Sequence, residues 1–315
     1  MTPVRLLLNS DFTGANAFFA LAAHRGLFAG TGLDIRFTPG RGAYTAAGRL
    51  ADEGFDAAFG DINALIELAA LRPDDALPVA VLLAHQNAPT CITVSRAGPL
   101  HQSADLAGRL LVGHASDVAL RTFPTYARAA GLDPLAVRVQ TSEARMADLL
   151  LDLLAGRSDG VFGYFTTHTA ALAGNGLAAE ACVRFLPYHA ACSALYGSAL
   201  MVAPHFLATS PDAVRALVQT TCAGLQAARA APEAAIDAVL ARSPSADRRV
   251  ERQRWEGTLY GDMGAPLTPD APWEGLGHAS GMRLAASIAA QAAASGWTRP
   301  PAAERIFTPE FLPRE

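Results

Sequence analysis

The chain has 315 residues, of which 51% are hydrophobic and 17% are charged, and its formal net charge is -4. This composition excludes an intrinsically disordered chain, and the lack of a basic stripe argues against a nucleic-acid partner. No run of eighteen apolar residues occurs in the sequence, so we expect no segment that spans a membrane.

The length of the chain favours two lobes over a single compact core. The first predicted strand begins almost at Met1, which leaves no room for a signal peptide. We therefore expect either a cytoplasmic protein or a periplasmic one from which an export segment has been removed.

The first elements in chain order predict a βαβ unit. Residues 4–9 form a short apolar run bounded by polar residues, which is typical of a buried strand. A turn follows, and residues 15–28 are expected to be helical, with Thr13 or Asn16 as the N-cap. Residues 33–38 predict a second strand, so the sheet should be parallel and the crossover right-handed.

The alternation of strands and helices continues along the chain. Further strands are expected at residues 55–60, 78–84, 91–95, 110–113, 137–140 and 160–164, and residues 185–188 and 199–202 bracket a second irregular crossing. Helices are expected at residues 45–53 and 61–71, from Arg121 to Ala130, and at residues 143–155. From Ser210 onward the sequence predicts an almost wholly helical segment, interrupted at residues 257–272 and ending in a proline-marked tail.

Two polar crossings, near residues 86–90 and 186–196, divide this pattern. They predict a lobe I made of residues 1–88 and 197–315, including the helical C-terminal part, and a lobe II made of residues 89–196. We expect the crossings to be the only covalent links between the lobes. The fold class is therefore α/β, with a hinge and a ligand cleft between the lobes.

Several motifs of the chain resemble those of a known group of proteins. They are NSDF at residues 9–12, HRGLF at 24–28, GLDI at 32–35, FGDINAL at 59–65, SADLAGR at 103–109 and FLP at 311–313. In their order they are similar to the substrate-binding proteins of ABC importers for taurine, sulfonates, nitrate and thiamine-pyrimidine precursors. The resemblance implies the type II periplasmic binding protein fold and hinge closure around a ligand.

The resemblance also implies what the chain does not do. The thiamine-pyrimidine synthase branch uses a cysteine-rich run and a histidine, but this chain has no such run, and Asn16 stands roughly where the pyrimidine binders carry a histidine. An aromatic-sulfinate desulfinase of the same fold has its catalytic cysteine just after the first strand, where this chain has Asn9 and Ser10. Neither chemistry is therefore expected.

Candidate ligand-binding residues of lobe I follow its predicted strands, because ligands collect at the carboxyl ends of parallel strands. Asn9, Asp11 and Asn16 offer hydrogen-bonding groups beside a helix N-terminus that favours anions; turn and cap roles are the competing interpretation. Phe12 could stack on a planar ligand or pack into the core. Tyr44 follows a Gly-Arg-Gly loop, from which its hydroxyl could reach the cleft.

The remaining candidates come from both lobes. Asp61 and Asn63 stand where the third strand leads into a helix, and helix capping is the competing interpretation for both. Ser116 and Asp117 begin the first helix of lobe II and would clamp a ligand from the far side. Tyr164 ends a strand and is the preferred aromatic candidate of that lobe.

No cofactor, metal site or catalytic constellation is predicted. The eight histidines show no HxH or HExxH spacing, and no GxSxG, Walker or GxGxxG motif occurs. The four cysteines fit neither a metal spacing nor a disulfide framework. Cys182 and Cys192 could pair, although buried free thiols are the simpler expectation.

These observations predict a monomeric, non-enzymatic solute-binding protein. It would capture a small polar or heteroaromatic molecule and deliver it to the permease and ATPase components of an ABC importer in the periplasm. Asp11 and Asp61 favour an amine or ring N–H on the ligand, whereas Arg41 and the helix N-termini favour an anion. The alternatives are an enzyme on the same fold, related to a pyrimidine-precursor synthase, decarboxylase or desulfinase, and a cytoplasmic ligand sensor.

Overall fold

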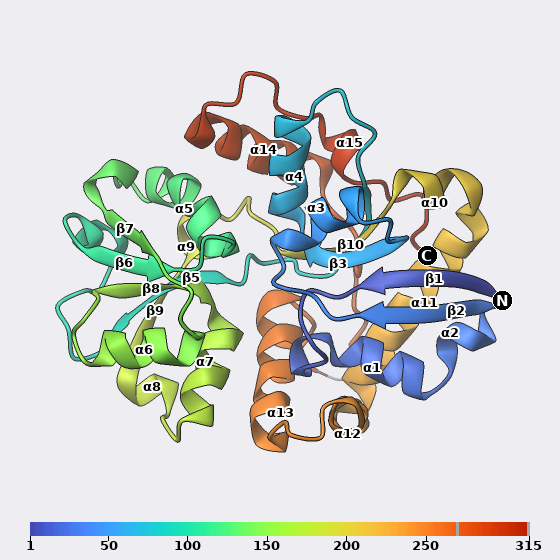
Figure 1. The fold of residues 1–315 in the computed structure, drawn as a ribbon, viewed down its shortest axis with the longest axis horizontal. Helices are drawn as coiled ribbons and strands as arrows, with labels where there is room; N and C mark the ends of the chain where they lie inside the picture. Colours follow the sequence, from blue (N-terminus) through green and yellow to red (C-terminus); the bar gives the residue numbers. More distant parts are fainter. Residues whose placement is uncertain (269–270, 314–315) are drawn as a thin grey trace.

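The computed structural model describes residues 1–268 and 271–313 and places them in two α/β lobes that lie side by side (Figure 1). Sheet A, in lobe I, has the strand order β2-β1-β3-β10-β4, and sheet B, in lobe II, has the order β7-β6-β8-β5-β9. The strands of sheet A are β1 (Thr2–Leu7), β2 (Leu33–Thr38), β3 (Ala57–Asp61), β4 (Val79–Leu83) and β10 (Ser198–Val202). Those of sheet B are β5 (Thr90–Ser95), β6 (Leu110–Gly113), β7 (Arg138–Thr141), β8 (Gly160–Tyr164) and β9 (Val183–Pro187).

Both sheets are mixed, whereas the sequence predicted parallel pairing. Strand β1 pairs in parallel with β2 and β3, but β10 runs antiparallel to β3 and β4. In sheet B, β6 is parallel to β7 and β8, and β5 is antiparallel to β8 and β9. The chain passes between the sheets twice, before β5 and before β10. A strand that enters a lobe from the hinge starts at the edge where the parallel strands end, so it must run against them.

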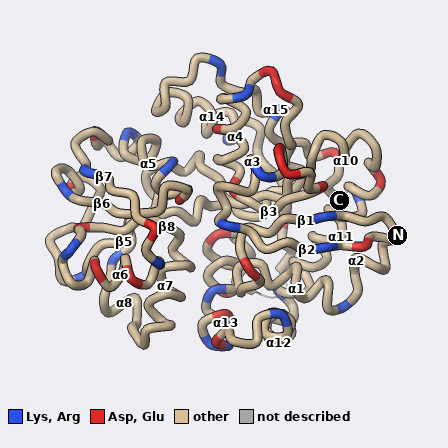
Figure 2. Tube along the Cα trace, viewed as in Figure 1, with Lys and Arg blue, Asp and Glu red and all other residues tan. Residues whose placement is uncertain are grey.

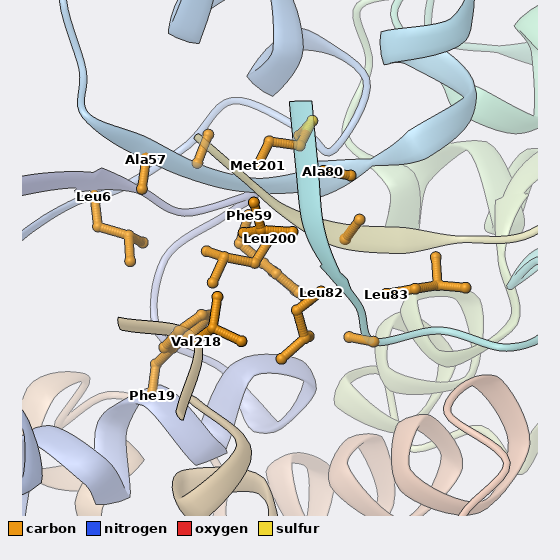
Figure 3. Close-up of a cluster of buried hydrophobic side chains, with 14 of the residues drawn as sticks. Leu6, Phe19, Ala57, Phe59, Ala80, Leu82, Leu83, Leu200, Met201 and Val218 are labelled. Carbon is orange, nitrogen blue, oxygen red and sulfur yellow. The ribbon is translucent and has the colours of Figure 1, made fainter. Parts of the chain in front are cut away.

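Helices cover both faces of sheet A. They are η1 (Gly14–Asn16), α1 (Ala17–His24), α2 (Leu27–Gly30), α3 (Thr45–Asp52), α4 (Ile62–Leu71), α10 (Pro204–Thr209), α11 (Pro211–Ala230), α12 (Pro232–Arg242), α13 (Arg248–Glu256), α14 (Gly281–Ser295) and α15 (Ala303–Ile306). Figure 3 shows Phe19 of α1 and Val218 of α11 packed beneath Phe59 and Leu200 of the sheet, all fully buried. This apolar layer holds the strand ends of lobe I in place.

The helix predicted over residues 15–28 is divided into α1 and α2. Gly26 has a φ of 68°, which is a left-handed backbone conformation. Residues other than glycine rarely adopt it, and it ends an α-helix. The chain turns there before α2 leads into β2.

Lobe II contains η2 (Ser103–Leu106), α5 (Val118–Ala129), η3 (Pro134–Ala136), α6 (Met146–Leu154), α7 (Phe165–Gly174), α8 (Ala179–Cys182) and α9 (Tyr188–Ala191). Its core includes Phe123 and Phe162, with ring centres 5.3 Å apart, and the stacked pair Tyr126 and Tyr188 at 4.1 Å. Helix α7 was not predicted from the sequence. All four cysteines are free thiols.

The C-terminal helices contact both lobes. Helix α13 packs against α7, and α14 packs against α5. Where the sequence predicted an interruption at residues 257–272, a π-helix, η4 (Gly257–Asp262), continues α13 instead. Residues 269 and 270 of that predicted interruption lie outside the described residues. Pro300 and Pro301 precede the short helix α15 in the tail that was predicted to be extended.

The surface charges are mixed. Figure 2 shows basic and acidic positions interspersed over both lobes. Within residues 1–268 and 271–313, no helix combines the length and apolar character that a membrane crossing requires.

Candidate functional site

Residues at the strand ends of both lobes form one pocket of about 320 Å³, which we call the cleft pocket. Lobe I contributes the loop after β2, and lobe II contributes the loop after β6, the end of β8 and parts of α5, α6 and α7. The lining residues are Arg41, Gly42, Ala43, His114, Ser116, Asp117, Val118, Met146, Tyr164 and Thr167. The structure thus brings three of the predicted residues together, namely Ser116, Asp117 and Tyr164.

A hydrogen bond between Tyr164 and Asp61 joins the lobes beside this pocket. The hydroxyl of Tyr164 donates to Oδ2 of Asp61 at 2.8 Å, and Oδ1 of Asp61 accepts from the backbone N of Asn63 at 2.9 Å. Asp61 is fully buried, and this burial raises the pKa of its carboxyl although three hydrogen bonds favour the charged form. Burial and the nearby Asp61 also raise the pKa of Tyr164 well above its ordinary value. Tyr164 is therefore a neutral donor.

Asp117 caps helix α5 at the wall of the pocket. Its Oδ1 accepts from the backbone N of Ala119 at 2.7 Å, as expected for an N-cap. Burial raises the pKa of Asp117 to about 6, against the lowering effect of the backbone N–H groups of Ala119 and Leu120 and of nearby His114. The Nε2 of His114 donates to the carbonyl of Ala144 at 2.7 Å. The pocket therefore combines a carboxyl group with a raised pKa, an arginine and a helix N-terminus.

Tyr44 takes part in a second contact between the lobes. Its hydroxyl donates to Oε2 of Glu67 at 2.8 Å, and Glu67 forms an ion pair with Arg121 of α5. The guanidinium of Arg121 lies over the Tyr44 ring, 5.3 Å from its centre. Burial and the Glu67 carboxylate raise the pKa of Tyr44 to about 12. Tyr44 belongs to this clasp of Tyr44, Glu67 and Arg121 and does not line the cleft pocket.

Asn9, Asp11 and Asn16 are occupied in a turn. The buried Asn16 accepts from the backbone N of Thr13 at 3.0 Å and donates to the carbonyl of Asp11 at 3.1 Å and to Oδ1 of Asn9 at 3.4 Å. Asp11 contributes only its carbonyl to these bonds, and its side chain is exposed. The competing turn interpretation accounts for all three residues, and none of them lines the cleft pocket.

Phe12 is also placed away from the cleft pocket. Its ring lies 5.3 Å from that of Phe37 and 4.6 Å from the guanidinium of Arg242, beside the apolar core of lobe I. The three side chains line a separate surface pocket. These contacts correspond to the core-packing alternative for Phe12, and the residue does not line the cleft pocket.

Asn63 connects lobe I internally. Its Nδ2 donates to Asp61 and to the carbonyl of Tyr196, both at 2.8 Å, and its Oδ1 accepts from Gln291 at 2.9 Å. With its amide used in this way, Asn63 supports Asp61 and the second crossing and does not line the pocket.

Sequence reasoning missed a set of buried polar side chains near the hinge. His85 and Asp262 are 3% and 6% exposed; within the described residues neither ring nitrogen of His85 has a hydrogen-bond partner, and the Asp262 carboxyl lies beside the hydroxyl of Thr258. Burial lowers the pKa of His85 to about 3 and raises that of Asp262 well above its usual range. The position of His85 just after the fourth strand was a usable signal. Asp262 had none, because its place depends on the π-helix.

Metal binding has no visible basis in the part of the chain that the structure describes. There, no group of three or more histidine, cysteine, aspartate or glutamate side chains lies close enough to hold an ion.

Comparisons with known proteins give the family and the fold. A family model described as NMT1/THI5 like matches residues 14–235. The periplasmic aliphatic sulphonate binding protein SsuA from Escherichia coli is 14% identical over 99% of both chains, with a TM-score of 0.74. The alkanesulfonate-binding protein SsuA from Xanthomonas axonopodis pv. citri, bound to MOPS, is 15% identical over 100% of this chain and 99% of that chain, with a TM-score of 0.70.

An enzyme shares the same architecture. A mutant of DSZB in complex with biphenyl-2-sulfinic acid is 14% identical over 99% of this chain and 98% of that chain, with a TM-score of 0.65. No curated protein matches the chain. Because the family model covers more than half of the sequence, the chain belongs to the NMT1/THI5-like family, and its two lobes have the fold of the periplasmic binding proteins.

Proposed function

We propose that the chain is a non-enzymatic solute-binding protein that captures a small polar or heteroaromatic molecule between its lobes and delivers it to an ABC importer. The observation that carries the proposal is the Tyr164–Asp61 hydrogen bond, which joins the lobes beside a pocket that both of them line. A molecule in that pocket contacts both lobes and so favours their closure. The likeness to two SsuA structures supports a transport role, and with it a periplasmic location.

The ligand-binding residues under this proposal are those of the cleft pocket. Ser116, Asp117 and Tyr164 act from lobe II, and Arg41 acts from lobe I. Arg41 and the N-terminus of α5 suit an anionic group, while Asp117 accepts from an N–H or O–H of the ligand. Asp61 acts as the partner of Tyr164 across the cleft. The lobes divide at residues 88/89 and 196/197.

The cysteine thiols give little support to an enzymatic role. Cys91 is 1% exposed, and burial raises its pKa; burial likewise raises the pKa of Cys222 to about 12. A thiol attacks as the thiolate, which such burial disfavours. The position just after β1 holds Asn9 and Ser10, neither of which is a thiol. At the position just after β1, the likeness to DSZB therefore extends to the fold and not to a thiol.

Thermal-shift measurements over sulfonates, pyrimidines and small carboxylates test the proposal. A ligand at a hundred times its dissociation constant should stabilise the folded state by about 2.7 kcal/mol. Ser116→Ala and Asp117→Asn should each weaken binding of the compound found. Tyr126→Phe is the matched control, because it removes a hydroxyl bond, between Tyr126 and Ser103, inside lobe II.

Two outcomes would reject the proposal. One is a bound compound whose affinity responds to neither cleft variant, since the ligand would then lie elsewhere. The other is steady formation of product from a bound compound by the purified protein.

A further inference from the structure

A surface pocket of about 550 Å³ lies along the edge of sheet A and shares no lining residue with the cleft pocket. We call it the edge pocket. Strand β2 is an edge strand of the sheet, and Leu33, Ile35 and Phe37 line the pocket from one face of it, because alternate residues of a strand point to the same side. A second wall comes from the short helix α2, through Phe28 and Ala29.

The body of the edge pocket is apolar and aromatic. The ring of Phe37 packs edge to face against the rings of Phe12 and Phe28, with ring centres 5.3 and 5.9 Å apart. Leu33 and Phe28 are buried, whereas Phe12, Ile35 and Phe37 are only partly buried and leave surface that a bound molecule can reach. Such a surface suits a flat apolar ring.

An arginine lies over this aromatic surface. Arg242 is the last residue of α12, and its guanidinium lies 4.6 Å from the centre of the Phe12 ring and 5.8 Å from that of Phe37. The hydroxyl of Ser243 donates to the carbonyl of Phe12 at 3.0 Å, which holds the end of α12 against this turn. Arg242 is therefore positioned by contacts within the protein and needs no ligand to place it.

The guanidinium of Arg242 is accessible and has no anionic partner in the part of the chain that the structure describes. The side chain is exposed, and among the described residues it forms neither an ion pair nor a hydrogen bond. Arg215, which also lies over a phenylalanine ring, differs because it donates to the carbonyl of Glu310 at 3.0 Å. Asp34 lines the edge pocket too, but it alternates with the pocket-facing residues of β2, so its side chain points to the other face, where its carboxylate lies 3.7 Å from Arg36. The edge pocket thus places a positive charge without a counter-ion beside aromatic surface.

We propose that the edge pocket binds an aromatic carboxylate, whose ring lies against Phe12 and Phe37 and whose carboxylate pairs with Arg242. A guanidinium presents parallel N–H donors that match the two oxygens of a carboxylate, and its contact with the rings leaves the N–H groups at its edge free to donate. The rings also exclude water from one side of the pair, which strengthens it. This site is separate from the one in the proposed function. All its lining residues come from lobe I, so its occupation does not depend on closure of the lobes.

Cinnamate is a suitable probe, with cinnamamide as a neutral counterpart of the same shape and cinnamylamine as a cationic one. Titration of the whole protein at neutral pH, followed by ligand-observed NMR, should give a dissociation constant for cinnamate of about 1 mM or tighter. Cinnamamide should bind more weakly, and cinnamylamine more weakly still, because Arg242 repels a cation. Arg242→Gln should weaken cinnamate about tenfold and leave cinnamamide nearly unchanged, since only the carboxylate uses the charge.

A second variant and a control complete the test. Ala29→Phe, at an exposed position of the rim, should fold and should fill the edge pocket, so it should weaken cinnamate and cinnamamide alike. Arg215→Gln is the matched control, because it also removes an arginine from a phenylalanine ring but lies outside the pocket, and it should leave both affinities unchanged.

Three outcomes would overturn the inference. The first is no detectable binding of cinnamate, or binding equal to that of cinnamamide. The second is cinnamate binding that ignores both edge-pocket variants. The third is weakening by Arg41→Gln in place of Arg242→Gln, which would put the probe in the cleft pocket. None of these measurements requires a cleft ligand, so they stand apart from the test of the proposed function.

Discussion

At the residue scale, Tyr164 and Asp61 show why a strand end is a useful place for a polar side chain. Each residue ends a strand, one in each lobe, and the following helix starts at once, so the backbone fixes both side chains at the boundary. Their hydrogen bond is made only when the lobes are close together. The pair therefore reports on the distance between the lobes.

Tyr164→Phe should open the unliganded protein. The change removes one partly buried hydrogen bond between the lobes, at a cost of about 1 kcal/mol, and the radius of gyration from small-angle scattering should increase. Tyr188→Phe removes a bond of similar length within lobe II and should cost similar stability without opening. An unchanged radius of gyration in Tyr164→Phe would show that other contacts hold the lobes together.

Asp117 should make the protein less stable as the pH rises through the mildly acidic range. Its pKa is about 6 in the folded state, against 3.8 for an ordinary aspartate. Between these values the folded chain holds a proton that the unfolded chain has released, so the free energy of unfolding falls as the pH increases, by at most about 3 kcal/mol. Asp117→Asn keeps the N-cap and removes this titration. Urea unfolding of both proteins at several pH values gives the free energy of unfolding as a function of pH. The curves of the two proteins should converge below about pH 4, and parallel curves would contradict the raised pKa.

At the scale of elements, the sequence pattern predicts the bounds of most strands within a few residues, because short apolar runs between turns can form few other structures. It fails at α7, whose sequence is rich in threonine and has weak helix propensity. Tertiary contacts supply what propensity lacks there, among them a 2.5 Å hydrogen bond between His168 and Thr93 of β5. The sequence pattern also misses the π-helix, because no local pattern encodes one.

The candidate site was predictable in part for a related reason. Ser116, Asp117 and Tyr164 follow strands of lobe II, and the topology rule alone places them at the cleft. Asn9 and Asn16 obey the same rule, but a turn uses the same amide groups as a ligand would. Only the three-dimensional structure distinguishes a turn role from a ligand-binding role for these amides.

The π-helix contains a matched pair of glycines that tests its packing on lobe II. A Cβ on Gly257 would lie 2.9 Å from Cγ2 of Thr166, whereas a Cβ on Gly261 meets nothing within 4 Å. Gly257→Ala should therefore destabilise the protein by about 1–3 kcal/mol through overpacking between η4 and α7. Gly261→Ala should be neutral or slightly stabilising, because it restricts the unfolded chain. Equal midpoints for the two variants in urea unfolding would show that η4 does not press on α7.

At the scale of the whole molecule, the clasp of Tyr44, Glu67 and Arg121 should tune closure more than stability. The Arg121 and Glu67 side chains are 41% and 17% exposed, and ion pairs so placed contribute about 0.2–1 kcal/mol. Arg121→Gln should leave the unfolding midpoint nearly unchanged and increase the radius of gyration of the unliganded protein. About 1 M salt, with a screening length of about 3 Å, should act in the same direction on the wild type and have little effect on the variant. If salt changed the radius of gyration of both proteins equally, the clasp would not contribute to closure.

Strand β10 has a consequence for the order in which the chain folds. It lies in the middle of sheet A, between β3 and β4, yet the whole of sheet B separates it from them in the sequence. On the ribosome, the five strands of sheet B are complete before β10 emerges, so lobe II can fold while lobe I still lacks a central strand. Contacts so distant along the chain form slowly, since a long loop must first close. Lobe I, where the chain begins, is thus the last part to be finished, and until then the strand edges of β3 and β4 stay open to a chaperone or to a neighbouring chain.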